Sequence, residues 1–186
     1  MSNPATSTKH IIKLGNARLS YPSLFREKKF APTDAKGSYS ATFILDKKAN
    51  AKEITAIKAS IDAITREVFK GKPVGNNRVC LHDGSEKEGT DGYGEGIMYV
   101  SARTDKRPQV VNRDLTPLTE EDGKPYAGCY VNATIELWAQ DNQYGKRINA
   151  KLRAVQFYKD GDSFGSARVD PAREFTAIND ADESPI

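Results

Sequence analysis

The segment 128–159 constrains the fold most, because it holds two long runs in which apolar and polar residues alternate. A period of two is typical of half-buried β-strands, whose successive side chains point to opposite faces of a sheet. The residues between the two runs, 141–145, end in glycine and suit a turn. The segment therefore predicts a long β-hairpin with one face in the core. The predicted core face consists of Cys129, Val131, Ala133, Ile135, Leu137, Ala139, Ile148, Ala150, Leu152 and Ala154.

The opposite face of the predicted hairpin has a composition that suits nucleic acid. It carries Trp138, the only tryptophan of the chain, and a row of cations formed by Arg147, Lys151 and Arg153. Residues paired across two strands share a face, so we expect the ring and the charges to lie together in solvent. Bases of a single strand stack on aromatic rings while its phosphates pair with cations. We therefore predict a site for single-stranded DNA here, with Tyr130 as a second stacking ring.

An alternative keeps the two aromatic rings of this face away from any DNA. Trp138 and Tyr130 would then pack under the C-terminal arm or against a neighbouring subunit, and the cations would form an ordinary solvated face. The alternation places Val155 and Phe157 on the same outward face, which favours this alternative for Tyr130. We expect Trp138, near the basic end of the hairpin, to be the better stacking platform.

Two further groups combine aromatic and basic residues. The segment 97–103 predicts a strand, and its outward face and following loop supply a second set of residues that we assign to the DNA-binding surface. These residues are Tyr99, Arg103, Lys106 and Arg107. Arg18, Tyr21 and Phe25 form the other group, which a loop held down by its aromatic rings explains equally well.

The remaining sequence predicts one long helix over 49–70. Its apolar residues recur every three or four positions and give a single stripe that packs on a sheet. The stripe consists of Ile54, Ile57, Ile61, Ile64 and Val68. Asn50 is expected to cap the helix, with Glu53 as its partner in a capping box.

Strands and loops complete the predicted organisation. Alternation predicts strands over 10–19 and 38–46, separated by a charged loop over 26–37. The segment 75–96, rich in glycine and carboxylates, predicts a mobile surface loop. The chain thus has about five strands that do not alternate with helices, which favours a small curved barrel over a parallel sheet.

We therefore predict a mainly β protein built on an OB-fold-like five-stranded barrel with one long α-helix. The barrel would form a DNA-binding domain over residues 9–165, after a disordered N-terminus over 1–8. A C-terminal arm with a flexible acidic tail would follow over 166–186.

Charge and cysteine content narrow the functional classes. The last ten residues hold three carboxylates and no lysine or arginine, so the rest has 28 basic and 22 acidic residues and a net charge of +6. A basic body is compatible with a polyanionic partner. Cys80 and Cys129 predict reduced, buried thiols, and they form no metal-ligand spacing with His10 or His82. The absence of a signal peptide and of a long apolar run predicts a cytoplasmic protein without membrane contact.

The sequence offers little for catalysis. Two histidines and two scattered cysteines suggest no Ser-His-Asp or Cys-His arrangement. We therefore predict a non-enzymatic protein with no cofactor and no bound metal. A metal-dependent nuclease built from Asp114, Glu136 and Lys151 is the enzymatic alternative.

Four strings of the sequence carry a resemblance to a known family. They are Ala17-Arg18-Leu19-Ser20-Tyr21-Pro22-Ser23-Leu24-Phe25, Tyr39-Ser40-Ala41-Thr42-Phe43, the run from Arg107 to Asp114, and Gly128-Cys129-Tyr130-Val131-Asn132 through Val155-Gln156-Phe157. They resemble a family of single-stranded-DNA-binding proteins of tailed phages, long catalogued only as a domain of unknown function. The resemblance spans about residues 9–165. It implies an OB-fold that coats unwound DNA during replication and recombination.

The end of the chain carries a second resemblance. Asp180, Asp182, Glu183 and the terminal Ile186 resemble the acidic tip by which bacterial and phage single-stranded-DNA-binding proteins recruit replication partners. Those tips typically end in phenylalanine, whereas this one ends in isoleucine. The resemblance implies contacts with replication and recombination proteins through the tail. A tail that only keeps the protein in solution is the alternative.

The sequence as a whole predicts a protein that binds and protects single-stranded DNA without sequence preference and without turnover. The main alternative is a non-enzymatic structural or replisome adaptor protein whose aromatic face binds protein. Binding to double-stranded DNA stays open, because a basic surface attracts any phosphate backbone. Formation of a homo-oligomer stays open as well.

Overall fold

The structure, a computed structural model, describes residues 9–29, 31–165 and 171–178. Within these ranges the chain is mainly β, with seven strands and one long helix. The strands are β1 (His10–Lys28), β2 (Ser38–Asp46), β3 (Leu81–Asp83), β4 (Ile97–Thr104), β5 (Gln109–Val111), β6 (Tyr130–Asn142) and β7 (Gly145–Lys159). The helices are α1 (Ala51–Val68) and the short α2 (Pro171–Glu174), and the 3-10 turns are η1 (Asn76–Arg78), η2 (Gly84–Lys87) and η3 (Glu120–Asp122).

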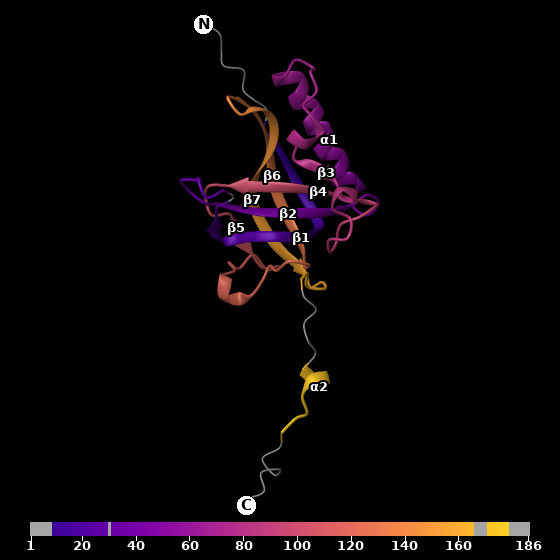
Figure 1. Ribbon diagram of the computed structural model, residues 1–186, viewed down its shortest axis with the longest axis vertical. Coiled ribbons are helices and arrows are strands. Elements are labelled where there is room, and N and C mark those ends of the chain that lie inside the picture. The colour runs from indigo at the N-terminus through magenta and orange to yellow at the C-terminus, as the bar shows by residue number, and fades with distance from the viewer. Residues whose placement is uncertain (1–8, 30, 166–170, 179–186) are drawn as a thin grey trace, which may run out of the picture.

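Five of the strands close into a barrel. β1 pairs antiparallel with both β2 and β6, β2 pairs with β4, and β6 pairs with β7. Parallel pairing of β4 with β7, with Ala102 opposite Ala150 and Arg103 opposite Lys151, closes the ring. β3 and β5 extend the sheet beyond the ring, from β4 and β7 (Figure 1). The prediction of an OB-fold-like five-stranded barrel with one long helix is therefore confirmed.

A bulge in β7 decides which residues of the hairpin enter the core. The pairing of β6 with β7 skips Arg153, which has no partner opposite it. Beyond such an extra residue the alternating side chains change face. Val155 and Phe157 are therefore buried, and the prediction that they face outward is wrong. The rest of the predicted core face is buried, except that Ala139 and Ala154 are only partly so.

The apolar stripe of α1 packs against β1 and β6, as predicted for a helix that covers a sheet. Ile54, Ile57 and Ile64 are buried and Ile61 is partly buried against the same core. Val68, at the last helical position, is exposed, so the stripe is one residue shorter than predicted. The two ends of the helix lie two residues inside the predicted bounds on either side.

The capping box predicted from Asn50 and Glu53 is wrong. The Asn50 side chain makes no cap hydrogen bond; it donates to the carbonyl of Gly15 at 2.9 Å and accepts the backbone N–H of Asp46 at 3.0 Å. The Asp46 carboxylate accepts the backbone N–H groups two and three residues further on. Those two bonds hold the pKa of Asp46 below its usual value. Asn50 therefore fastens the start of the helix to β1 rather than satisfying its first turn.

Two predicted loops contain regular structure. β1 continues to Lys28, beyond its predicted end at Leu19, and so includes the first part of the loop predicted over 26–37. The segment 75–96, predicted as a mobile loop, contains η1, β3 and η2, and β3 pairs with β4 so that His82 lies opposite Tyr99. A strand of three residues is too short to leave a periodic signal in a sequence.

Both cysteines are free and buried, as predicted. Burial raises the pKa of the Cys80 thiol to about 12 and that of Cys129 to about 11, because a thiolate is costly away from water. Neither residue is therefore a reactive thiolate at neutral pH. As for membranes, the described residues include no helix that combines the length and the apolar character needed to cross one.

Candidate nucleic-acid interface

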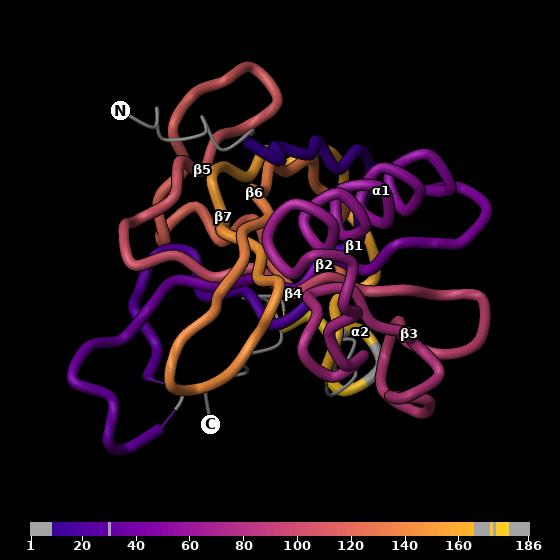
Figure 2. Tube along the Cα trace, turned by 90° about the horizontal axis from the view of Figure 1, so that it is seen from above, coloured from indigo at the N-terminus to yellow at the C-terminus, as the bar shows by residue number. Residues whose placement is uncertain are grey.

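A groove of about 970 Å³ runs over the outer face of β2 and β4. Ser40 and Thr42 of β2 and Ser101 of β4 line its floor, and the hydroxyl oxygens of Thr42 and Ser101 are hydrogen-bonded at 3.1 Å. These short side chains leave room for an extended chain to approach the sheet. The turn of the β6–β7 hairpin and the loop between β1 and β2 project from the same side of the barrel (Figure 2).

The tryptophan end of the groove consists of Trp138, Arg147 and Lys151. The hairpin register puts Trp138 opposite Asn149, and the Asn149 amide donates a 2.9 Å hydrogen bond to Gln140, which fixes the wall beside the ring. Trp138 is 45% exposed, so its ring is open to a ligand. Within the part of the chain that the structure describes, no hydrogen bond or salt bridge occupies the side chains of Arg147 and Lys151.

The lining of the groove is strongly basic. Closure of the barrel adds Arg103, because the parallel pairing places it opposite Lys151. Among the described residues that line the groove, seven side chains are cationic and one, Asp105, is a carboxylate. The cations are Lys28, Arg78, Lys87, Arg103, Lys106, Arg147 and Lys151. A cleft lined by one sign of charge focuses its field and raises the local concentration of a polyanion.

Tyr99, which the sequence assigns to the DNA-binding surface, is buried rather than open. It is 6% exposed, because β3 and η2 cover this part of β4. Its ring stacks on His82 at 5.1 Å and meets the edge of Tyr93 at 5.2 Å. Burial raises the pKa of the Tyr99 hydroxyl. Tyr99 therefore supports the wall of the groove from behind and offers no free face to a base.

Tyr130 lies at what we term the covered end of the hairpin, formed by Arg18, Tyr130 and Lys159. The Arg18 guanidinium lies 5.7 Å and the Lys159 ammonium 4.8 Å from the centroid of the Tyr130 ring. Arg18 Nε and Nη2 each donate a 3.0 Å hydrogen bond, to the carbonyls of Gly128 and Asp162. The chain directly after β7 thus crosses this end, whereas the alternative for Tyr130 places the C-terminal arm over 166–186 or a second subunit there.

The other predicted residues divide between the groove and its surroundings. Lys106 lines the groove, whereas the Arg107 guanidinium lies 5.7 Å from the ring of Phe25 and Arg153 is exposed at the bulge of β7. The structure therefore gathers five of the nine predicted residues in one groove. They are Trp138, Arg147, Lys151, Arg103 and Lys106.

Sequence reasoning missed several residues that line the groove. Lys28, Arg78 and Lys87 come from the end of β1 and from two 3-10 turns, where no periodicity marks a face. The sequence groups Tyr21 with Arg18 and Phe25 and does not decide between a binding group and a loop held down by its aromatic rings. It lines the groove and belongs to its other end, the tyrosine end, together with His82 and Lys87.

The two carboxylates of the nuclease alternative, Asp114 and Glu136, come from a loop after β5 and from β6. The Asp114 carboxylate accepts hydrogen bonds from the backbone and hydroxyl of Thr116 within its own loop. Glu136 lies across the hairpin from Lys151. No group of three His, Cys, Asp or Glu side chains in residues 9–29, 31–165 and 171–178 is arranged to hold a metal ion. The tail residues Asp180, Asp182, Glu183 and Ile186 lie outside these ranges.

Comparison with known proteins identifies one family and one similar protein from a phage. Residues 10–185 match the family described as the ssDNA-binding protein of Enterobacter phage Enc34. Protein p50 of Acyrthosiphon pisum secondary endosymbiont phage 1 is 40% identical to this chain over 188 residues, which cover 94% of this chain and 97% of that protein.

Solved structures support the same family and the same fold. The single-stranded DNA-binding protein from bacteriophage Enc34 in complex with ssDNA is 30% identical, with a TM-score of 0.76, over 84% of this chain and 90% of that one. The single-stranded DNA-binding protein gp2.5 of bacteriophage T7 is 13% identical, with a TM-score of 0.51, over 86% of this chain and 97% of that one. At that identity the second similarity concerns the fold alone.

Proposed function

This chain belongs to the family of the Enterobacter phage Enc34 ssDNA-binding protein, and we propose that it binds single-stranded DNA in the groove over β2 and β4. The observation that carries the proposal is an open tryptophan beside seven cations in one groove. The relative solved with ssDNA supports it. In five-stranded OB barrels the face of the second and third barrel strands, here β2 and β4, binds oligonucleotides together with the adjoining loops.

Binding would combine two effects that need no base sequence. The cations of the groove pair with phosphates and release counterions, so affinity falls with salt by a slope of about −0.7 per neutralised phosphate. A base stacks on Trp138, which contributes about 1–3 kcal/mol and suits every base because each has a π-face. The groove floor of hydroxyl groups adds hydrogen-bonding partners without selecting one base edge. The product of this arrangement is a protein that coats DNA without preference for sequence.

The test is a titration of the full chain with oligo-dT at low salt. Trp138 is the only tryptophan, so its emission reports on one wall of the groove. We expect saturable quenching, a parallel rise in anisotropy of a labelled oligonucleotide, and loss of both as salt increases. Unchanged emission and anisotropy at low salt up to high oligonucleotide concentration would contradict the proposal.

The same proposal includes the absence of turnover and a role in phage DNA replication and recombination within the cytoplasm of the host. The phage origin of the family supports a role in phage DNA metabolism inside the host. A labelled oligonucleotide incubated with the protein and Mg²⁺ is expected to stay intact on a gel, whereas the nuclease alternative predicts its loss. For the adaptor alternative, DNA affinity would be weak and indifferent to Trp138→Ala.

Duplex DNA and self-association are further parts of the proposal. A basic groove attracts the phosphates of a duplex too, but a paired base cannot stack on Trp138 without leaving its helix. We therefore expect duplex binding to be weaker and not to quench Trp138. Sedimentation with and without oligo-dT would show whether copies of the chain associate along DNA.

For the tail we propose competition with DNA and recruitment of replication or recombination proteins. Asp180, Asp182, Glu183 and the terminal carboxylate can pair with the basic groove as any nearby polyanion does. Truncation after Thr176 should therefore tighten DNA binding, and the gain should shrink as salt rises. It should also abolish partner contacts, for which Ile186 would supply the apolar end. An unchanged affinity at low ionic strength would leave recruitment or solubility as the only roles of the tail.

A further inference from the structure

An irregularity in β1 turns one aromatic ring into the groove. Ser20 lies opposite Thr42 and Ser23 opposite Ser40, so two residues of β1, Tyr21 and Pro22, face a single residue of β2. Such a bulge re-aims a side chain, and bulges are common beside functional sites. Tyr21 also has a φ of 46°, a conformation that is rare for a bulky side chain and persists only where its surroundings hold it.

The consequence of the bulge is an exposed ring in a fixed place. Tyr21 is 57% exposed and lines the groove. Its neighbour Ser20 is buried, and the hydroxyl groups of Ser20 and Tyr93 are hydrogen-bonded at 2.9 Å. That contact fastens the backbone just before Tyr21. The bulge therefore changes the direction of the Tyr21 side chain from the one it would have in a regular strand. As a result the ring is exposed to solvent in the groove.

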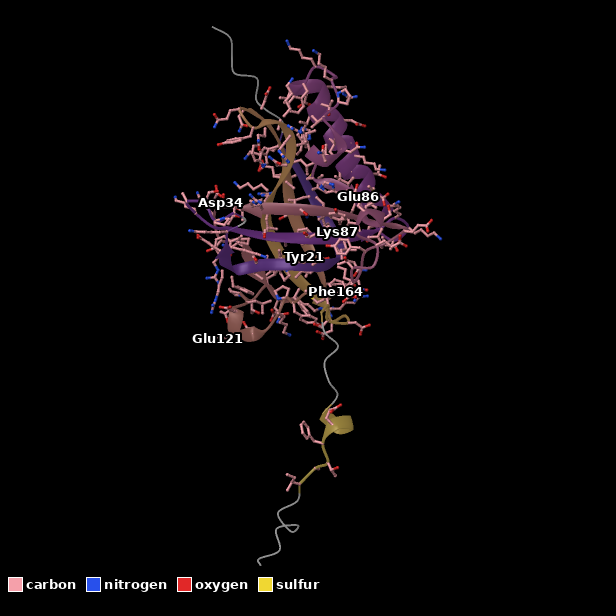
Figure 3. The ribbon with its side chains drawn as sticks, viewed as in Figure 1. Tyr21, Asp34, Glu86, Lys87, Glu121 and Phe164 are labelled. Carbon is pink, nitrogen blue, oxygen red and sulfur yellow. The ribbon has the colours of Figure 1, made fainter. Side chains whose placement is uncertain are left out.

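Lys87 supplies a cation over one face of this ring. Its ammonium nitrogen lies 5.3 Å from the ring centroid of Tyr21, 5.2 Å from that of Tyr93 and 4.9 Å from that of Tyr99. Lys87 takes part in none of the salt bridges among the described residues, and it lines the groove. Figure 3 shows Tyr21, Lys87 and Glu86 on the same side of the barrel. The three rings hold the ammonium group in place while leaving its charge available to a phosphate.

The register of the barrel places this ring and Trp138 on the two outermost strands of the groove. The strand order across the groove is β6, β7, β4, β2 and β1, with Trp138 on the first and Tyr21 on the last. On this path over the curved outer surface they are four strand spacings of about 4.8 Å apart, about 19 Å in all, although β1 and β6 pair directly on the other side of the barrel. The groove between them is the one lined by the seven cations.

We propose that Tyr21 and Lys87 form a second nucleotide-binding site, in which a base stacks on Tyr21 and the adjoining phosphate pairs with Lys87. A bound strand then crosses β7, β4 and β2 from Trp138 to Tyr21. The inference rests on the proposed function, since it adds a second anchor to the same groove. It also defines the path of the DNA over the barrel.

The test compares variants of Tyr21 in oligo-dT titrations of the full chain. Tyr21→Ala should weaken binding of an oligonucleotide long enough to reach both rings by about 5- to 150-fold, the loss of one stacked base. Quenching of Trp138 at saturation should stay as in the wild type, and so should binding of oligonucleotides too short to span the groove. Tyr21→Phe, which keeps the ring, should bind within about twofold of the wild type.

Two further variants separate the ring from the backbone and from other tyrosines. Tyr21→Asn removes the ring but suits a positive φ, so it should lose as much affinity as Tyr21→Ala. Tyr144→Ala is the matched control, because Tyr144 is 72% exposed at the hairpin turn and does not line the groove. Lys87→Met should reduce the salt dependence by about 0.7 in slope, as expected for one phosphate contact fewer.

The outcomes distinguish this inference from the proposed function. If Tyr21→Ala binds long oligonucleotides as the wild type does while Trp138 is still quenched, the second site is wrong and the proposed function stands. Loss of affinity in Tyr21→Ala but not in Tyr21→Asn would assign the effect to the backbone and also overturn the second site. If the wild type neither binds oligo-dT nor shows quenching, the proposed function itself fails.

Discussion

The two ends of the β6–β7 hairpin carry the same kinds of residues in opposite situations. At the tryptophan end, Trp138 is open and the side chains of Arg147 and Lys151 make no hydrogen bond or salt bridge within the described residues. At the covered end, Arg18 and Lys159 lie over the Tyr130 ring, and the Arg18 guanidinium donates hydrogen bonds to two backbone carbonyls. An aromatic residue beside cations therefore indicates a ligand site only where one face of the ring and the donors of the cations stay free.

Close backbone packing explains why the covered end is closed. Gly128 has a φ of 104°, and a Cβ there would overlap the carbonyl oxygen of Asp162. Gly161 in turn lies against the carbonyl of Gly128 and the ring of Tyr130. The Arg18 guanidinium lies 4.4 Å from the centroid of the Phe164 ring. The chain after β7 is thus part of the fold at this end and packs against the ring of Tyr130.

The largest effect is expected from a side chain placed in that close contact. Gly128→Ala should lower the free energy of unfolding by about 2–5 kcal/mol, combining a left-handed backbone with overpacking. Gly123→Ala is the matched control, since Gly123 also has a positive φ, 68°, but no atom near a new Cβ. It should cost only about 1–2 kcal/mol. Denaturant unfolding measures both, and equal losses would show that the covered end is not tightly packed.

Replacing each aromatic ring by alanine tests directly whether DNA binds at the tryptophan end and not at the covered end. Trp138→Ala should weaken oligo-dT binding by about 1–3 kcal/mol, because a stacked base is lost. Tyr130→Ala should leave the affinity within about twofold, since that ring is covered by Arg18, Lys159 and the chain after β7. Anisotropy of a labelled oligonucleotide measures both variants. Equal losses would mean that DNA also reaches the covered end.

The charges of the two ends should differ in the salt dependence of binding. The double variant Arg147→Gln with Lys151→Gln should reduce the slope of log affinity against log salt by about 1.4, two phosphate contacts at about 0.7 each. Lys159→Gln removes a cation of the covered end and should leave the slope unchanged. A smaller slope in Lys159→Gln would mean that DNA phosphates also bind at the covered end.

The smallest effect concerns His82 at the tyrosine end. Burial lowers the pKa of His82 below 6.5, an effect that the nearby Glu86 carboxylate opposes and Lys87 reinforces. Below pH 6.5 the unfolded chain therefore takes up a proton that the folded chain binds less well, and stability falls as pH decreases through this window. His82→Gln should remove that part of the pH dependence between pH 7 and pH 5. If the stability of the wild type and of His82→Gln depended on pH in the same way, His82 would not be the source of this pH dependence.

Local patterns in the sequence predict the hairpin and much of the tryptophan end. Alternation is a local property, so it assigns Trp138, Arg147 and Lys151 to one face without knowledge of the fold. Arg103 joins them only through the parallel pairing that closes the barrel, which links residues far apart in the sequence. The structure places Arg103 in the groove, as the sequence expects, but no local pattern could have shown that Lys151 is its neighbour.

The errors have physical causes that a local pattern does not contain. The extra residue Arg153 reverses the faces of β7, so Val155 and Phe157 enter the core. Tyr99 alternates correctly on β4, but β3 covers it, and a three-residue strand has no period to detect. Tyr21 reaches the groove because of a bulge and a positive φ, which a sequence without glycine at that point gives no reason to expect.

A crystal structure of the full chain with oligo-dT tests the central claim most directly. The account predicts a strand of DNA in the groove, with a base on the ring of Trp138 and phosphates beside Arg103, Arg147 and Lys151. It also predicts that the covered end around Tyr130 is packed as it is without DNA. Bases lying over Tyr130 and Arg18, with the groove over β2 and β4 empty, would contradict it.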